Sequence, residues 1–314
     1  MKKLIAVVGP TATGKTALAV ALARAIDGEI VGADSRQVYR RMDIGTAKPT
    51  AEERALVPHH LLDAVDPDEP FSIARYLELA TAALDDIWDR GRQPLLVGGS
   101  GQYVWALLEG WTVPRLPPQR ELRRSLEERA AQEGAEALHR ELARIDARAA
   151  ARIDPRNVRR VIRAMEVYQA TGRPISFWQE KAPPGWDTLI LGLTCSRDEL
   201  YRRIDSRVEG MVQAGLVEEV RGLLAMGYSR ELPSMSGIGY REVCQYLAGE
   251  LELPAAVARI KTATHRLARQ QSTWFRRDDP RIRWLDVSPG DPFPEALRLV
   301  ESELGLRRTV THGR

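Results

Sequence analysis

Residues 9–16 read Gly9-Pro10-Thr11-Ala12-Thr13-Gly14-Lys15-Thr16 and fit the phosphate-loop pattern G-x-x-x-x-G-K-[ST] without a mismatch. The apolar residues 4–8 before this loop predict a buried strand, and the Ala- and Leu-rich residues 16–26 after it predict a helix. In that context backbone N–H groups and a helix N-terminus converge on phosphate oxygens. We expect Lys15 to hold the outer phosphate and the Thr16 hydroxyl to bind Mg²⁺. The loop therefore predicts binding of a di- or triphosphate, without indicating which one.

Strand and helix patterns alternate through the first third of the chain. Strands are predicted at residues 3–9, 29–34, 94–98 and 189–194, and helices at 16–26 and 73–90. This alternation is typical of an α/β fold, a phosphate-loop NTPase-like parallel sheet flanked by helices. Ligands of such sheets bind beyond the carboxyl ends of the strands. We therefore expect the phosphate loop, Asp34 and the turn Gly98-Gly99-Ser100-Gly101 to converge.

Proline clusters divide the chain into two predicted domains. Residues 119–179, which show only helical patterns, lie between Pro117-Pro118 and Pro183-Pro184. We predict an α/β core of residues 1–117 and 187–314 and an all-helical insertion of residues 118–186. From residue 197 to the end we expect the core to contain helices only.

Composition limits the classes of function. The chain has 314 residues, 44% of them apolar, and a net charge of +3, so a nucleic-acid surface would have to come from local patches. Cys195 and Cys244 lack metal-ligand spacing, which fits a reducing cytoplasm and argues against a disulfide framework or a zinc site. No apolar run has the length of a membrane span, so no membrane association is expected.

Several residues could carry chemistry, each with a plainer alternative. Asp34 could bind Mg²⁺ through water or accept a proton, or it could simply cap the next segment. Ser100 could contact a substrate or belong to an ordinary turn. Arg207 could reach the phosphates or form a surface ion pair. The loop at residues 43–49, which holds one of the few lysines, could line the site or lie on the surface.

Two basic tracts could bind RNA or could be solvated faces. The first is predicted to share one helix face in the insertion and comprises Arg156, Arg159, Arg160 and Arg163. The second is interleaved with His265, Trp274 and Phe275 and comprises Arg259, Lys261, Arg266, Arg269, Arg276 and Arg277. A GTPase is disfavoured because the sole asparagine, Asn157, is followed by valine rather than by the lysine of a base-reading motif.

Taken together, the motifs resemble the bacterial tRNA dimethylallyltransferases, also called tRNA isopentenyltransferases. The resemblance spans nearly the whole chain and rests on residues 9–16, 34–39, 42–49 (MDIGTAKP), 95–100 (LLVGGS), 159–167, 236–241 (SGIGYR) and 270–276 (QQSTWFR). Members transfer a dimethylallyl group from dimethylallyl diphosphate to N6 of adenosine at tRNA position 37. Diphosphate is released and Mg²⁺ is required, so the phosphate loop of this nucleotide-binding fold would serve a diphosphate leaving group.

The resemblance implies roles for individual residues. It assigns the diphosphate to Gly9, Pro10, Thr11, Ala12, Thr13, Gly14, Lys15, Thr16 and Arg207, with the metal at Thr16. Asp34 would accept the N6 proton, and Ser100, where many relatives have threonine, would position the reacting groups. Contacts to the tRNA anticodon stem-loop would come from Asp34, Ser35, Arg36, Gln37, Ser100, Arg159, Arg160, Val161, Ile162, Arg163, Ser236, Gly237, Ile238, Gly239, Tyr240 and Arg241.

The expected enzyme is a cytoplasmic monomer with tRNA and dimethylallyl diphosphate as its partners. Three alternatives stay open on the sequence: a phosphate-loop kinase of a small metabolite, an isopentenyltransferase of free adenine nucleotides, and an RNA-binding NTPase-like module without turnover.

Overall fold

The computed structural model describes residues 2–116, 119–288 and 290–306 and separates into two compact units. The first unit joins residues 1–107 and 185–314, and the second comprises residues 108–184. The expected boundary at Pro117-Pro118 lies outside the described residues. Within the described ranges, no helix is long and apolar enough to cross a membrane.

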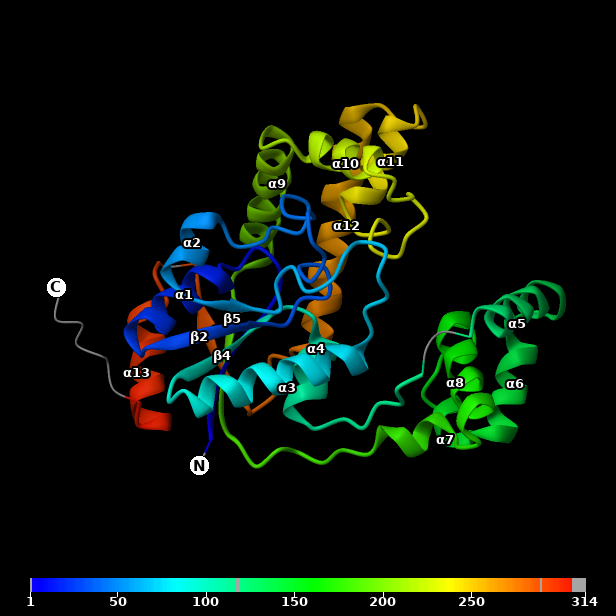
Figure 1. Ribbon diagram of the computed structural model, residues 1–314, viewed down its shortest axis with the longest axis horizontal. Helices are drawn as coiled ribbons and strands as arrows, with labels where there is room; N and C mark the ends of the chain where they lie inside the picture. The colour runs from blue at the N-terminus through cyan, green and yellow to red at the C-terminus, as the bar shows by residue number, and fades with distance from the viewer. Residues whose placement is uncertain (1, 117–118, 289, 307–314) are drawn as a thin grey trace. The chain divides into compact units, whose positions relative to one another are not determined.

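A six-stranded sheet forms the centre of the first unit (Figure 1). Its strands are β1 (Lys3–Val8), β2 (Gly28–Gly32), β3 (His59–His60), β4 (Gln93–Gly98), β5 (Asp187–Thr194) and β6 (Ile282–Asp286). They run parallel in the order β3-β2-β4-β1-β5-β6. Strand β1 lies inside the sheet, where Ile5 pairs with Leu95 on one side and with Leu189 on the other. The predicted parallel α/β fold is confirmed, and the loops after β1, β2 and β4 leave the sheet at the same edge.

Nine helices of the described chain belong to this unit or end at its border. They are α1 (Lys15–Ala25), α2 (Ala51–Leu56), α3 (Ile73–Asp89), α4 (Gly101–Leu108), α9 (Arg197–Gln213), α10 (Leu216–Ala225), α11 (Tyr240–Leu247), α12 (Leu253–Trp274) and α13 (Phe293–Leu304). Helices α1 and α13 pack with the sheet into one apolar core that includes Leu22, Leu191 and Val300. The hydrophobic effect on this core is what fixes α1, and with it the phosphate loop, against the sheet.

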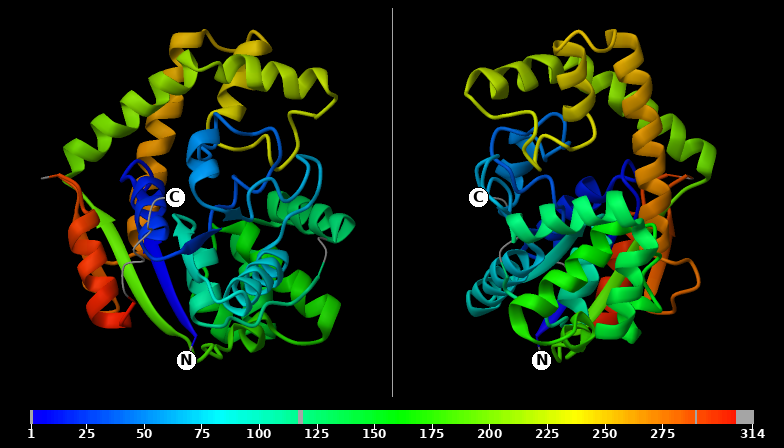
Figure 2. Two further views of the ribbon diagram at one scale, coloured as in Figure 1. Left: turned by 60° about the vertical axis from the view of Figure 1, so that its left-hand side comes forward. Right: turned by 90° about the vertical axis from the view of Figure 1, so that its right-hand side faces the viewer.

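A second apolar core lies among α9, α10, α11 and α12 and extends to the chain that follows β2. Val38, Met42, Ile204, Leu216 and Tyr240 are among its buried members. Figure 2 shows the loop after β2, in blue, beneath these helices, which are coloured from yellow-green to orange. This core therefore anchors residues 38–42, which no strand or helix holds, close to the carboxyl edge of the sheet.

The second unit is helical. It contains α5 (Arg120–Glu133), α6 (Ala135–Ile145), α7 (Ala147–Ala150), α8 (Val158–Thr171) and a short 3₁₀ helix at Ile175–Gln179. Leu126, Leu142 and Met165 belong to its core. The carboxylate of Glu166, with no exposed surface, accepts bonds from Arg123 and Arg163 inside the unit. A buried carboxylate needs such partners because ionised groups are costly to bury alone.

Two strands were not predicted, and the expectation of helices alone after residue 197 is wrong. Strand β6 runs through Ile282–Asp286, where Arg283 and Trp284 interrupt the apolar pattern, and β3 consists of His59–His60 only. Both are edge strands, paired on one side, so neither needs the continuous apolar sequence of a buried strand. Arg156 precedes α8 and pairs with Asp154, so it does not lie on the helix face predicted for it.

Candidate active site

The phosphate loop has the backbone that its glycines permit. Gly9 has a φ of 135°, and a Cβ there would lie 2.6 Å from the carbonyl oxygen of Leu193 on β5. Gly14, with a φ of 85°, is the N-cap of α1. The Lys15 ammonium donates to the Pro10 carbonyl oxygen at 2.6 Å, so the lysine folds back over the loop. The loop is thus curled around the N-terminus of an 11-residue helix, a ready anion site.

One cavity of about 310 Å³ collects most of the residues expected at the diphosphate and the base. Its lining includes Lys15, Thr16, Asp34 and Arg207. The Arg207 guanidinium, from α9, donates to the Thr11 hydroxyl at 3.4 Å. Two cations, a hydroxyl and a carboxylate therefore meet in one pocket at the carboxyl edge of the sheet, as the strand-end argument predicts.

The pocket perturbs the Lys15 ammonium. Burial and the neighbouring Arg207 charge lower the pKa of Lys15 to about 8, and Asp34 opposes them in part. A bound anion would favour the charged lysine and raise that pKa again. The pocket thus gathers positive charge, which a diphosphate would neutralise.

The side chains of Asp34 and Ser100 each accept a hydrogen bond from the backbone just after β2. Asp34 Oδ1 accepts the N–H of Arg36 at 2.8 Å, which fixes the carboxylate just beyond β2. The Ser100 hydroxyl accepts the N–H of Ser35 at 3.1 Å. Ser100 is not among the residues that line the cavity. Its bond to the Ser35 N–H holds the segment that carries Asp34. The turn at Asp34 leaves the role of proton acceptor open, because the turn uses only one of the two carboxylate oxygens.

Gln271 is a pocket residue that the sequence did not single out. Its side chain is 8% exposed, accepts the Thr11 N–H through Oε1 at 2.8 Å and donates from Nε2 to the Gly99 carbonyl at 3.0 Å. A Cβ at Gly99 would lie 2.4 Å from Nε2. Gln271 therefore joins the phosphate loop to the second glycine turn. Only its position in the matching segment 270–276 could have drawn attention to it.

The cavity has a further wall in residues 43–49, which we call the wall loop. Thr46, Ala47, Lys48 and Pro49 line the cavity. The Gln37 amide donates to the carbonyl oxygens of Thr46 at 3.1 Å and of Ala47 at 3.0 Å. Gln37 was expected to contact RNA, but its amide N–H groups bind the wall loop.

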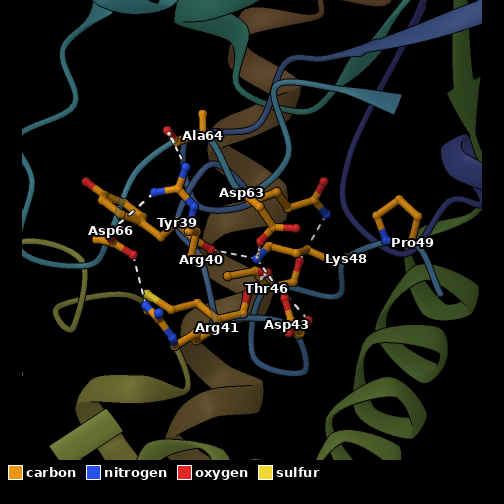
Figure 3. A network of polar contacts seen from close by, with 12 residues as sticks. Tyr39, Arg40, Arg41, Asp43, Thr46, Lys48, Pro49, Asp63, Ala64 and Asp66 are labelled. Atoms are coloured by element: carbon orange, nitrogen blue, oxygen red, sulfur yellow. Dashed lines mark hydrogen bonds and ion pairs between the residues drawn. The ribbon is translucent and has the colours of Figure 1, made fainter. Parts of the chain in front are cut away.

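Lys48 braces this loop from within (Figure 3). Its side chain is 1% exposed, and Nζ donates to the Tyr39 carbonyl at 2.6 Å, to Asp43 at 2.7 Å and to Asp63 at 2.6 Å. Asp63 also binds Arg54 at 2.8 Å. All three Lys48 protons are thus occupied, so this lysine is a structural cation of the wall rather than a free ligand for phosphate.

The segment at residues 233–241 adjoins the chain after β2. Arg36 donates to the Pro233 carbonyl at 2.8 Å, and the Ser236 hydroxyl donates to the same oxygen at 2.6 Å. Tyr240 is 1% exposed, whereas Arg241 is exposed and pairs with Glu242. The structure thus brings Arg36 together with residues 233–237, whereas Ser35 and Gln37 bond elsewhere. Tyr240 is buried beside them, and its side chain is removed from solvent.

In the helical unit, fewer of the predicted residues are exposed for contact with RNA than expected from the sequence. Arg159 and Arg160 are exposed at the start of α8. Val161 and Ile162 are 1% and 3% exposed and belong to the core of the unit, so their side chains cannot contact RNA. Arg163 binds the buried Glu166 at 2.6 Å. Successive helical residues point about 100° apart, so five in a row cannot share one face.

The sheet, the phosphate loop and the cavity define a phosphate-loop protein in which Lys15 and Arg207 lie beside a carboxylate. More narrowly, the chain belongs to the family described as IPP transferase, whose model matches residues 37–278. The model described as Isopentenyl transferase matches residues 2–63.

Relatives named tRNA dimethylallyltransferase resemble the chain over most of its length. One from Roseiflexus sp. (strain RS-1) is 55% identical and one from Roseiflexus castenholzii 58% identical, each over 96% of this chain and 98% of its own. The solved tRNA isopentenylpyrophosphate transferase of Bacillus halodurans is 42% identical with a TM-score of 0.72, and 97% of each chain is covered. A eukaryotic dimethylallyltransferase acting on tRNA is 28% identical, with a TM-score of 0.77 over 97% of this chain and 77% of that one.

Proposed function

We propose that the chain is a tRNA dimethylallyltransferase. It transfers the dimethylallyl group of dimethylallyl diphosphate to N6 of the adenosine at tRNA position 37, releases diphosphate and leaves N6-isopentenyladenosine. The observation that carries this proposal is the single cavity in which Lys15, Arg207 and Asp34 meet. Family membership and the names of the relatives support the reaction class.

The phosphate loop would bind the leaving group. Its backbone N–H groups, the Lys15 ammonium and the Arg207 guanidinium would surround the diphosphate as the bond between the allylic carbon and the phosphate oxygen breaks. Charge builds up on the departing oxygen in that step, and preorganised donors stabilise such charge strongly in a confined site. The pKa of Lys15 is lowered to about 8. A bound anion would favour the protonated ammonium, so Lys15 would carry its full positive charge against the diphosphate.

Asp34 would serve the other half of the reaction. The lone pair of adenine N6 is delocalised into the ring, so N6 becomes an adequate nucleophile only as it loses a proton. As the bond from N6 to the allylic carbon forms, that proton passes to the Asp34 carboxylate, and the bonding electrons of the broken C–O bond leave with diphosphate. A carboxylate within hydrogen-bond reach suits such a general base.

The proposed magnesium ion fits the oxygen donors of the cavity. Thr16 supplies a hydroxyl at the start of α1, and Asp34 supplies a carboxylate in the same cavity. Mg²⁺ is usually held by one or two protein oxygens together with substrate phosphates. When bound, it would neutralise part of the diphosphate charge.

RNA would reach Asp34 along Ser35, Arg36 and the segment 236–241, with its target base turned out of the stack. Arg159 and Arg160 would contact the phosphates of the anticodon stem. We further propose that the enzyme acts as a monomer in the cytoplasm, where its tRNA substrate is found.

A transfer assay tests the function. Labelled dimethylallyl diphosphate and Mg²⁺ are incubated with unmodified tRNA, with AMP or with ATP as the acceptor. Label in tRNA that disappears when the position-37 adenosine is replaced by guanosine is the expected result. Label in AMP or ATP alone would assign the chain to nucleotide prenylation, and ATP consumption with a small acceptor would favour a kinase.

A further inference from the structure

Glu219 on α10 accepts four hydrogen bonds with one carboxylate. Its Oε2 receives the backbone N–H groups of Asp43 at 2.9 Å and Ile44 at 2.7 Å. Its Oε1 receives the N–H of Gly45 at 3.1 Å and the hydroxyl of Tyr240 at 2.6 Å. Three successive N–H groups aimed at one anion form a backbone nest of the kind that binds phosphate elsewhere, and here a side chain of the protein fills it.

The packing around this carboxylate leaves little freedom. A Cβ at Gly45 would lie 2.5 Å from the Tyr240 ring, so the loop can pass the ring only with glycine there. Tyr240 is 1% exposed. Its burial, together with the Glu219 charge, raises the pKa of the phenol, so Tyr240 remains a hydrogen-bond donor at every ordinary pH. The two sequence segments MDIGTAKP and SGIGYR are therefore joined through a residue that lies in neither.

The residues held by Glu219 lead directly into the catalytic cavity. Thr46 follows Gly45 by one peptide bond, and residues 46–49 line the cavity that also contains the phosphate loop. Glu219 itself is not among the lining residues. Gln37 binds the carbonyl oxygen of Thr46, and Lys48 ties the loop to the carbonyl oxygen of Tyr39. Glu219 anchors the start of the loop, at residues 43–45. Its influence on a ligand must pass through the loop backbone.

We infer that Glu219 is a positioning residue for dimethylallyl diphosphate: by binding residues 43–45 and Tyr240, it sets the wall of the cavity against which the isoprenoid diphosphate lies. The inference rests on the proposed function for the identity of the ligand. The RNA path also has an anchor of its own at the start of α11, where the Gly239 N–H binds Glu242 at 2.9 Å, so this turn is not held by the Tyr240–Glu219 bond alone. Loss of Glu219 should therefore act on one substrate far more than on the other.

Glu219→Gln is the main test. The amide has one acceptor oxygen and would turn its NH₂ group toward two donors, so about half of the four bonds are lost. We expect the KM for dimethylallyl diphosphate to rise on the order of tenfold, and the KM for tRNA to change less than about twofold. Tyr240→Phe keeps the ring against Gly45 and removes one bond, so the same KM should rise by a smaller factor.

Glu218→Gln is the matched control. Glu218 precedes Glu219 on α10, is exposed and pairs only loosely with Arg221 at 3.4 Å, so both KM values should stay at the wild-type level. If Glu219→Gln does not fold, Tyr240→Phe alone decides. The inference is overturned if the KM for dimethylallyl diphosphate is unchanged, or if kcat/KM falls equally for both substrates.

Calorimetric binding of dimethylallyl diphosphate, without RNA, separates this inference from the proposed function. A wild-type protein that binds the diphosphate but prenylates no acceptor would end the proposed function and leave the role of Glu219 testable. Equal affinity in wild type and Glu219→Gln would end the inference even if tRNA is prenylated.

Discussion

Replacing Lys48 by methionine should remove the brace of the wall loop and lower the free energy of unfolding by about 2–4 kcal/mol. Lys48 makes three bonds through a side chain that is 1% exposed. The Tyr39 carbonyl would lose its buried donor, which costs about 1–3 kcal/mol. Asp63 would keep Arg54 at 2.8 Å, and Asp43, with 56% of its side chain exposed, could be rehydrated. The loss should therefore fall below the largest values known for broken buried pairs.

Urea denaturation followed by circular dichroism measures this loss. Lys261→Met is the matched control, because Lys261 also pairs with a carboxylate, Glu209 at 2.6 Å, but on the surface. We expect the control to cost less than about 1 kcal/mol. A Lys48→Met protein no less stable than Lys261→Met would refute the structural role of the lysine.

The pH dependence of the same difference provides a second check. Burial would raise the pKa of Asp63, but the bonds and charges of Lys48 and Arg54 outweigh it, so the pKa lies below its ordinary value. A carboxyl whose folded pKa is lowered stabilises the protein above its unfolded pKa and loses that contribution as pH falls through the folded pKa. The gap between wild type and Lys48→Met should hence be full at neutral pH and shrink below about pH 4.

Three further predictions concern the ligands. Diphosphate affinity should weaken as pH rises through about 8, because Lys15 loses its proton in the free protein, and calorimetry should find no such dependence in Lys15→Met. Gln271→Met should weaken diphosphate binding by about tenfold through loss of the bonds to Thr11 and Gly99, while the exposed neighbour Gln270→Met should not; equal affinities would contradict the bridging role. Arg160→Ala should lower the salt slope of tRNA binding by about one, whereas Arg156→Ala, which removes a partner of Asp154, should change it less; identical slopes would return Arg160 to an ordinary surface role.

Local patterns in the sequence were enough to predict the centre of the fold. The phosphate loop and four apolar strands are set by residues that are adjacent in the chain, so β1, β2, β4 and β5 could be placed within a few residues. The meeting of Lys15, Asp34 and Arg207 in one cavity follows in part from the same logic, since strand ends share an edge. For Arg207 the sequence left contact with the phosphates and a surface ion pair open, and only the resemblance favoured the phosphates, because the residue lies on a helix far along the chain.

The parts that were missed depend on tertiary contacts. Gln271 and Glu219 act by accepting backbone N–H groups from distant loops, and no spacing in the sequence announces such bonds. Lys48 looked like a loop residue because burial of its ammonium depends on Asp63 and Tyr39, which the fold brings to it. Val161 and Ile162 were carried over as part of a continuous segment, although helix geometry turns them into the core.

The proposed reaction requires Asp34 to take the N6 proton while the phosphate loop holds the diphosphate. The direct measurement is single-turnover transfer by Asp34→Asn with both substrates bound, alongside calorimetric affinities for dimethylallyl diphosphate and tRNA. Asparagine keeps the acceptor for the Arg36 N–H but cannot take a proton, so we predict a loss of at least about 10²-fold in the transfer rate with both affinities close to those of wild type. A transfer rate equal to that of wild type would contradict the role of Asp34 as the general base.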